Sequence, residues 1–203
     1  MDAKLVDLLI QREIIKEDDA PLYLYGLRNL FLDLLNIAVL TVISLILGMF
    51  SQFLIFMGFY VPLRYFAGGF HASSATKCFF FSVGIILVVF TCLKFIPWST
   101  SLNLSIALIS AAVIAFLAPV ADANKPLDAD ENRVYRKMAI RVLGVQVIVF
   151  LILLYSGISQ MAVNTITLVF AVMAAMLILG IGKQRFGAVR GQEEIQNESE
   201  CSC

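Results

Sequence analysis

The sequence predicts an all-α, polytopic membrane protein with about six transmembrane helices and an amphipathic helix before the first of them. Of its 203 residues, 60% are hydrophobic and only 15% are charged, and the mean hydropathy is +0.89. These values lie far outside the range of soluble domains. The apolar residues also gather into separate runs, most of them close to the ~20 residues that a helix needs to cross a ~30 Å hydrocarbon core.

The N-terminal segment, residues 1–27, predicts an amphipathic helix in the membrane interface. Leu, Val and Ile recur at roughly helical spacing among charged residues between Leu5 and Ile15, as in helices that bury one face among lipid headgroups. Such a helix anchors the chain or docks a second amphipathic peptide helix. The segment holds too many charges for a signal-peptide core, so we expect it to be retained.

Six apolar runs are candidates for transmembrane helices. The second run is short and ends at Pro62, so it is tilted, continues past Arg64, or is re-entrant; a count of five spans is therefore the main alternative. The six runs are Asn29–Met49, Gln52–Leu63, Phe79–Trp98, Leu102–Val120, Val142–Ile158 and Met161–Ile181.

The basic residues predict the orientation of these spans. With a cytoplasmic N-terminus, the connections expected outside (residues 50–51, 99–101 and 159–160) contain no Lys or Arg. Of the 15 basic residues, all except Lys94 fall on the side expected to be inside, which is the bias found in cytoplasmic loops. We therefore expect both termini and the segment 64–78 to be cytoplasmic, where thiols stay reduced.

The single histidine, His71, lies seven residues before Cys78, and this pair suggests a cysteine nucleophile. A thiol attacks well only as thiolate, and a neighbouring neutral imidazole is the usual base. Gly68 and Gly69 allow a turn that folds the histidine toward the cysteine and leave their N–H groups available to an oxyanion. Arg64 is a candidate for binding a carboxylate of a substrate or of a structural partner. Taken singly, the cysteine is most often a packing residue, the histidine a solvated side chain and the glycine pair a turn. Their occurrence together at one predicted cytoplasmic edge is what favours a catalytic role.

A second polar element spans residues 121–141 and is too polar to enter lipid. Its plain interpretation is a cytoplasmic connector; the functional alternative is that the turn Asn124-Lys125-Pro126 and the following bases hold an acidic or C-terminal carboxylate group. A rival interpretation is a magnesium–diphosphate site of the prenyl-transferase kind, which is weaker because there is one acidic cluster only. Its residues would be Asp122, Asp128, Asp130 and Glu131.

The remaining polar features concern the first span and the C-terminus. Asp33 and Asn36 are costly in lipid, so we expect them to face protein. Asp33 is a candidate for orienting the imidazole of His71. We expect residues 1–190 to form a single integral-membrane domain and the acidic tail, residues 191–203, to be disordered.

Three sets of residues resemble the accessory gene regulator B (AgrB-type) family of bacterial quorum-sensing peptidases. They are Arg64 with Gly68-Gly69-x-His71 and Cys78, the loop from Ala118-Pro119 to Asn124-Lys125-Pro126, and the amphipathic N-terminus leading into Tyr25-Gly26. The resemblance implies a cysteine endopeptidase of the bacterial cytoplasmic membrane that removes the C-terminal part of a short AgrD-type precursor peptide. It implies an acyl thioester on Cys78, with His71 as base, and closure of a thiolactone or lactone ring. It also implies a homodimer.

Two other classes of function compete with this interpretation. A peptide exporter or other transporter suits the polytopic architecture, although the spans carry almost no buried charge. A metal-dependent prenyl or lipid transferase would use the acidic loop. For the peptidase we expect the precursor peptide and membrane lipid as partners, with no nucleic acid and no cofactor. We also expect no metal site, because the four cysteines show no zinc-type spacing.

Overall fold

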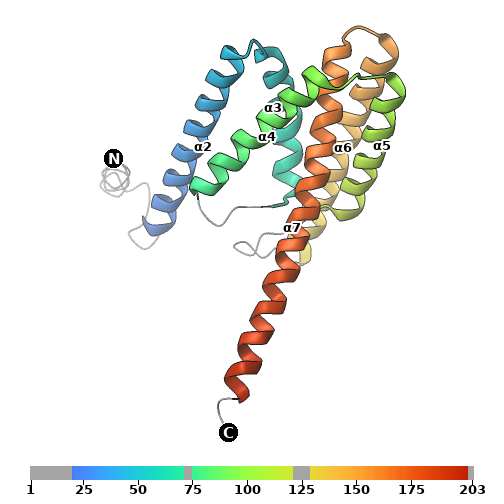
Figure 1. Cartoon of the computed structure of the whole chain (residues 1–203). Helices are drawn as coiled ribbons and strands as arrows, with labels where there is room; N and C mark the ends of the chain where they lie inside the picture. Colours follow the sequence, from blue (N-terminus) through green and yellow to red (C-terminus); the bar gives the residue numbers. More distant parts are fainter. Residues whose placement is uncertain (1–19, 71–74, 121–128, 201–203) are drawn as a thin grey trace. The chain divides into compact units, whose positions relative to one another are not determined.

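The computed structural model describes residues 20–70, 75–120 and 129–200, and this part of the chain is mainly helical, with short non-helical connections between the helices (Figure 1). Six helices are present in it, and an isolated parallel bridge joins Gly68 to Val120. Most of the N-terminal segment, His71, and the turn Asn124-Lys125-Pro126 lie outside the described residues. The helices are α2 (Ala20–Ile46), α3 (Phe50–Ala67), α4 (Ala75–Phe95), α5 (Thr100–Leu117), α6 (Ala129–Ser156) and α7 (Gln160–Glu200).

Four of the described helices contain stretches long and apolar enough to cross a membrane, which supports an integral membrane protein. The stretches are Thr76–Phe95, Thr100–Leu117, Asp130–Ser156 and Gln160–Gln184. The first predicted span coincides with a shorter apolar stretch of α2, Leu30–Ile46. The second falls on α3, which contains Pro62 and carries Arg64 in its last turn. A count of six spans therefore stays a prediction.

The chain divides into two compact units, and the first contains α2 and the beginning of α4 as far as Ile86. Within α2, Leu40 and Ser44 are buried, and the Ser44 hydroxyl donates to the carbonyl of Thr41 at 2.7 Å. The helix ends in a tight turn at Gly48, whose φ of 68° is in the left-handed region that glycine adopts without strain.

The second unit contains α3, the rest of α4, and α5, α6 and α7. Helices α5, α6 and α7 lie side by side (Figure 1). The span of α7 is the most enclosed of the three: 56% of its most apolar stretch is buried inside the protein, against 22% for the corresponding stretches of α5 and α6. Phe150 of α6 and Phe170 of α7 are both fully buried and meet edge to face, with ring centroids 6.1 Å apart. Helix α7 is thus the core element against which this unit is built.

Buried amide side chains link the helices of the second unit. Asn103 of α5 is fully buried and donates to the Asn164 side chain at 2.9 Å, while its own oxygen accepts from Thr167 at 2.9 Å. Both partners are on α7, so the two helices are joined by polar as well as apolar contact. Gln146 of α6 donates to the carbonyl of Phe59 at 2.7 Å, in the turn of α3 that precedes Pro62. Its Oε1 is buried and has no hydrogen-bond partner among the residues that the structure describes.

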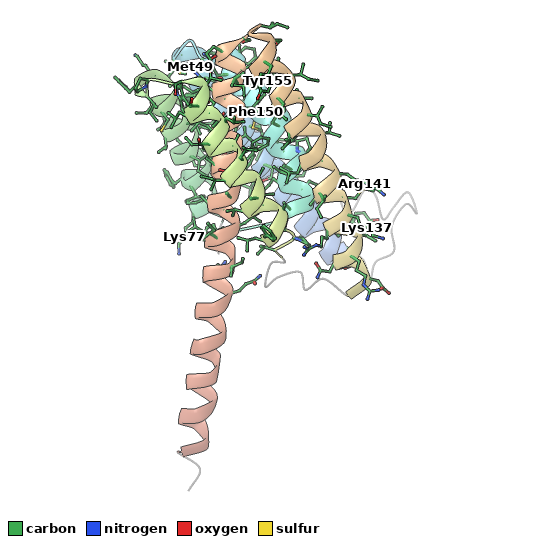
Figure 2. All side chains as sticks on the ribbon, turned by 90° about the vertical axis from the view of Figure 1, so that its right-hand side faces the viewer. Met49, Lys77, Lys137, Arg141, Phe150 and Tyr155 are labelled. Atoms are coloured by element: carbon green, nitrogen blue, oxygen red, sulfur yellow. The ribbon has the colours of Figure 1, made fainter. Side chains whose placement is uncertain are left out.

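Helix α6 begins at Ala129, so the basic residues 133–141 are on a helix, not on a connector. Acidic residues in its first turn, Asp130 and Glu131, favour the N-terminus of a helix. Figure 2 shows Lys137 and Arg141 toward one end of α6 and Tyr155 toward the other. The charged residues of this long apolar helix thus lie toward one end of it, and which side of the membrane that end faces stays a prediction.

Helix α7 continues past α5 and α6 to Glu200 (Figure 1). We expected residues 191–203 to be disordered, whereas the helix includes 191–200. The segment 192–196 (Gln-Glu-Glu-Ile-Gln) contains mostly good helix formers, and it extends a helix that is already nucleated.

Candidate active site

Cys78 is the fourth residue of α4 and is half-buried. Its carbonyl accepts a hydrogen bond from the Ser82 hydroxyl at 3.0 Å, one turn further on. The next two residues, Phe79 and Phe80, meet edge to face with ring centroids 5.5 Å apart. The thiol is therefore carried by the first turn of a strongly apolar helix, and an aromatic pair follows it in the sequence.

The glycine segment, residues Gly68–Phe70, follows the end of α3 and leads directly to His71. Its backbone is non-helical, and each of its N–H groups has a backbone acceptor. Gly68 donates to the Arg64 carbonyl at 3.1 Å, Gly69 to the Val120 carbonyl at 3.3 Å, and Phe70 to the Met176 carbonyl at 3.0 Å. Since a buried backbone N–H without an acceptor is costly, these bonds explain how the chain leaves a helix here at low cost.

The connection between α5 and α6 takes part in the same arrangement. The N–H of Val120 donates to the carbonyl of Ala67, the last residue of α3, at 3.0 Å. The Val120 carbonyl in turn accepts the hydrogen bond from Gly69. Ala67 and Val120 are buried, with exposed fractions of 0% and 6%. Two stretches that are about 50 residues apart in the sequence thus form one short parallel bridge.

Arg64 holds the glycine segment from the side of α3. Its Nη1 donates to the Gly68 carbonyl and its Nη2 to the Phe70 carbonyl. The planar fork of a guanidinium suits two acceptors spaced in this way, which an ammonium does not match. The structure thus gives Arg64 two backbone partners, while binding of a substrate carboxylate by this residue stays a prediction.

Both glycines occupy conformations that suit only glycine. Gly68 has a φ of 67° and Gly69 a φ of 119°. A Cβ on Gly68 would overlap the Val120 carbonyl, and a Cβ on Gly69 would overlap the Arg64 guanidinium. From the sequence we predicted that the two glycines form a turn. The structure shows a second reason for glycine at both positions, which is that other parts of the chain approach their Cα atoms closely.

The other candidate residues are placed less closely or not at all. We expected Asp33 and Asn36 to face protein. Asp33 is exposed on α2, whereas Asn36 is half-buried. Asp33 lies near the start of the apolar stretch Leu30–Ile46, where a carboxylate can still reach water. Its proposed contact with His71 falls outside the described residues, as do Asn124, Lys125 and Pro126.

Sequence reasoning missed two residues of α7 that contact the glycine segment, Met176 and Gly180. The Met176 carbonyl accepts from Phe70, and Gly180 lies against the peptide between Gly69 and Phe70. The signal in the sequence was a small residue inside a long apolar run, a pattern that marks close packing of helices in membranes. Lys183, one turn beyond Gly180, places its Nζ 5.4 Å from the centre of the Phe70 ring.

The fold and these residues define an integral membrane protein of helical class with a half-buried thiol at the start of one apolar helix. The chain belongs to the accessory gene regulator B family, whose model matches residues 3–181. That family is one of processing proteases and is associated with AgrD-type precursor peptides, so membership supports a role in processing quorum-sensing peptides. Comparison with curated proteins and with solved structures gives no match.

Proposed function

We propose that this protein is a membrane cysteine endopeptidase that removes the C-terminal part of an AgrD-type precursor and promotes ring closure in the remaining peptide. The observation that carries the proposal is the position of Cys78, which is half-buried in the first turn of an apolar helix. The single histidine of the chain precedes it by seven residues. Membership of a processing protease family supports the same reading.

The proposed chemistry has two acyl transfers. His71 takes the proton of the Cys78 thiol, and the thiolate attacks the scissile carbonyl. The peptide C–N bond then breaks, His71 returns the proton to the leaving amine, and the N-terminal part of the precursor stays on Cys78 as a thioester. A side-chain thiol or hydroxyl of the same peptide attacks this thioester, closes a thiolactone or lactone ring, and regenerates the Cys78 thiol.

Water must be kept from the thioester for this scheme to give a ring. Exchange of one thioester for another is nearly neutral, whereas hydrolysis runs downhill and yields a linear peptide. The glycine segment ends in Phe70, and Phe66 lies shortly before it; both rings are half-buried, and Phe66 meets Tyr135 with 6.4 Å between ring centroids. We propose that these rings limit access of water; an unchanged ratio of cyclic to linear product in Phe70→Ala would contradict this.

Supporting roles are proposed for the remaining candidate residues. Arg64, Gly68 and Gly69 fix the backbone that precedes His71, as their contacts indicate. The turn Asn124-Lys125-Pro126 holds a carboxylate group of the precursor, and Asp33 orients the imidazole. We propose further that the chain acts as a homodimer in the bacterial cytoplasmic membrane, with both termini and the active site on the cytoplasmic side.

The test is co-expression with an epitope-tagged precursor encoded beside the gene. Wild-type protein, Cys78→Ala and His71→Ala are compared by gel and mass spectrometry, with Cys92→Ala as the matched control. Cys92 is also half-buried in α4 but lies near the opposite end of that helix. The proposal is supported if wild type and Cys92→Ala shorten the precursor and Cys78→Ala and His71→Ala do not. Processing by Cys78→Ala equal to that of wild type contradicts it.

A further inference from the structure

Helix α7 carries a contact that the proposed catalytic pair does not explain. Met176 and Gly180 are four residues apart, so they share one face of the helix. The Phe70 N–H donates to the Met176 carbonyl at 3.0 Å. The carbonyl of a helical residue is normally flanked by the side chain four residues on, and here that residue is a buried glycine. The missing side chain is what lets the glycine segment reach the helix backbone.

The space beside Gly180 is smaller than a methyl group needs. A Cβ on Gly180 would lie 3.0 Å from the carbonyl carbon of Gly69, 3.0 Å from the nitrogen of Phe70 and 3.2 Å from Cγ1 of Val120. Carbon atoms pack at about 3.5–4.0 Å, so the peptide between Gly69 and Phe70 would have to move away from α7. That movement lengthens the hydrogen bond to Met176.

The glycine segment has little freedom to move in response. On its other sides it is held by the Arg64 guanidinium and by the bridge to Val120. A displacement forced at Gly180 therefore falls on the peptide between Gly69 and Phe70, which directly precedes His71 in the sequence. Catalytic groups must stay within ~0.5 Å of productive geometry, so a shift of a few tenths of an ångström at the preceding peptide bond matters.

We infer that Gly180 is a positioning residue for the proposed peptidase: by lacking a side chain it seats the segment that carries His71 on the backbone of α7. This inference rests on the proposed function, because it assigns the seat of the proposed base. Gly180 itself does not touch the substrate in this scheme. Its effect is on the rate of the acyl-transfer step and not on binding of the precursor.

The chain supplies a matched control two residues away. Gly182 is in the same helix, and a Cβ there would meet nothing within 4 Å. Both substitutions to alanine bring the same gain in helix propensity. The difference between Gly180→Ala and Gly182→Ala therefore isolates the contact with the glycine segment.

The experiment is single-turnover cleavage of a labelled precursor peptide by purified full-length protein in nanodiscs, with enzyme in excess. We expect Gly180→Ala to lower the cleavage rate about 10- to 100-fold, the scale of a small misplacement in an active site. Its dissociation constant for the precursor should match that of wild type, and its melting temperature should stay above the temperature of the assay. Gly182→Ala should stay within about twofold of wild type, by the same reasoning.

Two outcomes overturn the inference. Cleavage by Gly180→Ala at the rate of Gly182→Ala contradicts it, and so does a loss of rate that is accounted for by the fraction of Gly180→Ala unfolded at the temperature of the assay. Cys78→Ala in the same assay separates this failure from that of the proposed function, since that proposal fails if Cys78→Ala cleaves as wild type does.

Hydrogen–deuterium exchange supplies a measurement on the wild-type protein that does not depend on how a variant folds. The amides of Gly69 and Phe70 should exchange slowly, because both are bonded to backbone carbonyls. Exchange of these amides as fast as in an unstructured peptide contradicts the proposed seat on α7.

Discussion

Replacement of Arg64 distinguishes two roles for this residue. The guanidinium donates to the carbonyls of Gly68 and Phe70, whereas the sequence alone suggested a site for a carboxylate. Arg64→Lys keeps the charge but reaches one carbonyl at most, and Arg64→Met removes both donors while keeping most of the apolar stem. The first substitution thus removes one hydrogen bond and the second removes two.

The expected magnitude follows from the number of bonds lost. A hydrogen bond to a charged group contributes about 1.5–3 kcal/mol, and 1.4 kcal/mol is about tenfold in an equilibrium constant. The equilibrium that holds the glycine segment should weaken about 10- to 150-fold in Arg64→Lys. Arg64→Met should weaken it further, because both carbonyls then lose their donor in a half-buried position.

Single-turnover cleavage and precursor affinity, measured on the same samples, separate the two roles. If Arg64 holds the segment, the rate falls in the order wild type, lysine, methionine, while the dissociation constant of the precursor stays the same. A weaker affinity with an unchanged single-turnover rate would refute our reasoning and favour the carboxylate site. Equal rates together with equal affinities in all three proteins would refute both roles.

Three further predictions concern stability. Gly68→Ala should destabilise the protein more than Gly157→Ala, because both residues have a φ near 67° but only a Cβ on Gly68 overlaps the Val120 carbonyl; the left-handed strain alone costs about 1–2 kcal/mol in each. Equal melting temperatures for the two variants would contradict this. Asn103→Leu should lower stability by about 1–2 kcal/mol, since it removes two interhelical bonds. Gln146→Leu should cost less than Asn103→Leu in denaturant unfolding, because it also removes a buried oxygen that has no partner; the reverse order would contradict this.

The helices were predictable because their signals are local. The fourth predicted span, Leu102–Val120, corresponds to α5, with boundaries that differ by two to three residues. Ser99 caps its start, its side chain accepting from the N–H of Leu102 at 3.2 Å. Its end falls before Pro119, since the residue preceding a proline is disfavoured in helical conformation. Both signals were in the sequence, but hydropathy alone does not use them.

The arrangement of the glycine segment was not predictable, because its partners are distant in sequence. Arg64, Gly68 and Gly69 could be selected by residue type and spacing, and Gly69 then proved to contact the chain at Val120. Nothing in a hydropathy pattern pairs residue 69 with residue 120, or Phe70 with Met176. Periodicity reports which face of a helix is apolar, whereas such contacts depend on which helices become neighbours.

The central claim is that Cys78 carries the cleaved peptide as a thioester, and intact-protein mass spectrometry of an acid-quenched reaction tests it most directly. Wild type and Cys92→Ala should gain the mass of the N-terminal part of the precursor, and hydroxylamine should remove it. Cys78→Ala should show neither the adduct nor the shortened precursor. Cleavage by Cys78→Ala, or an adduct located on another residue, would contradict the account.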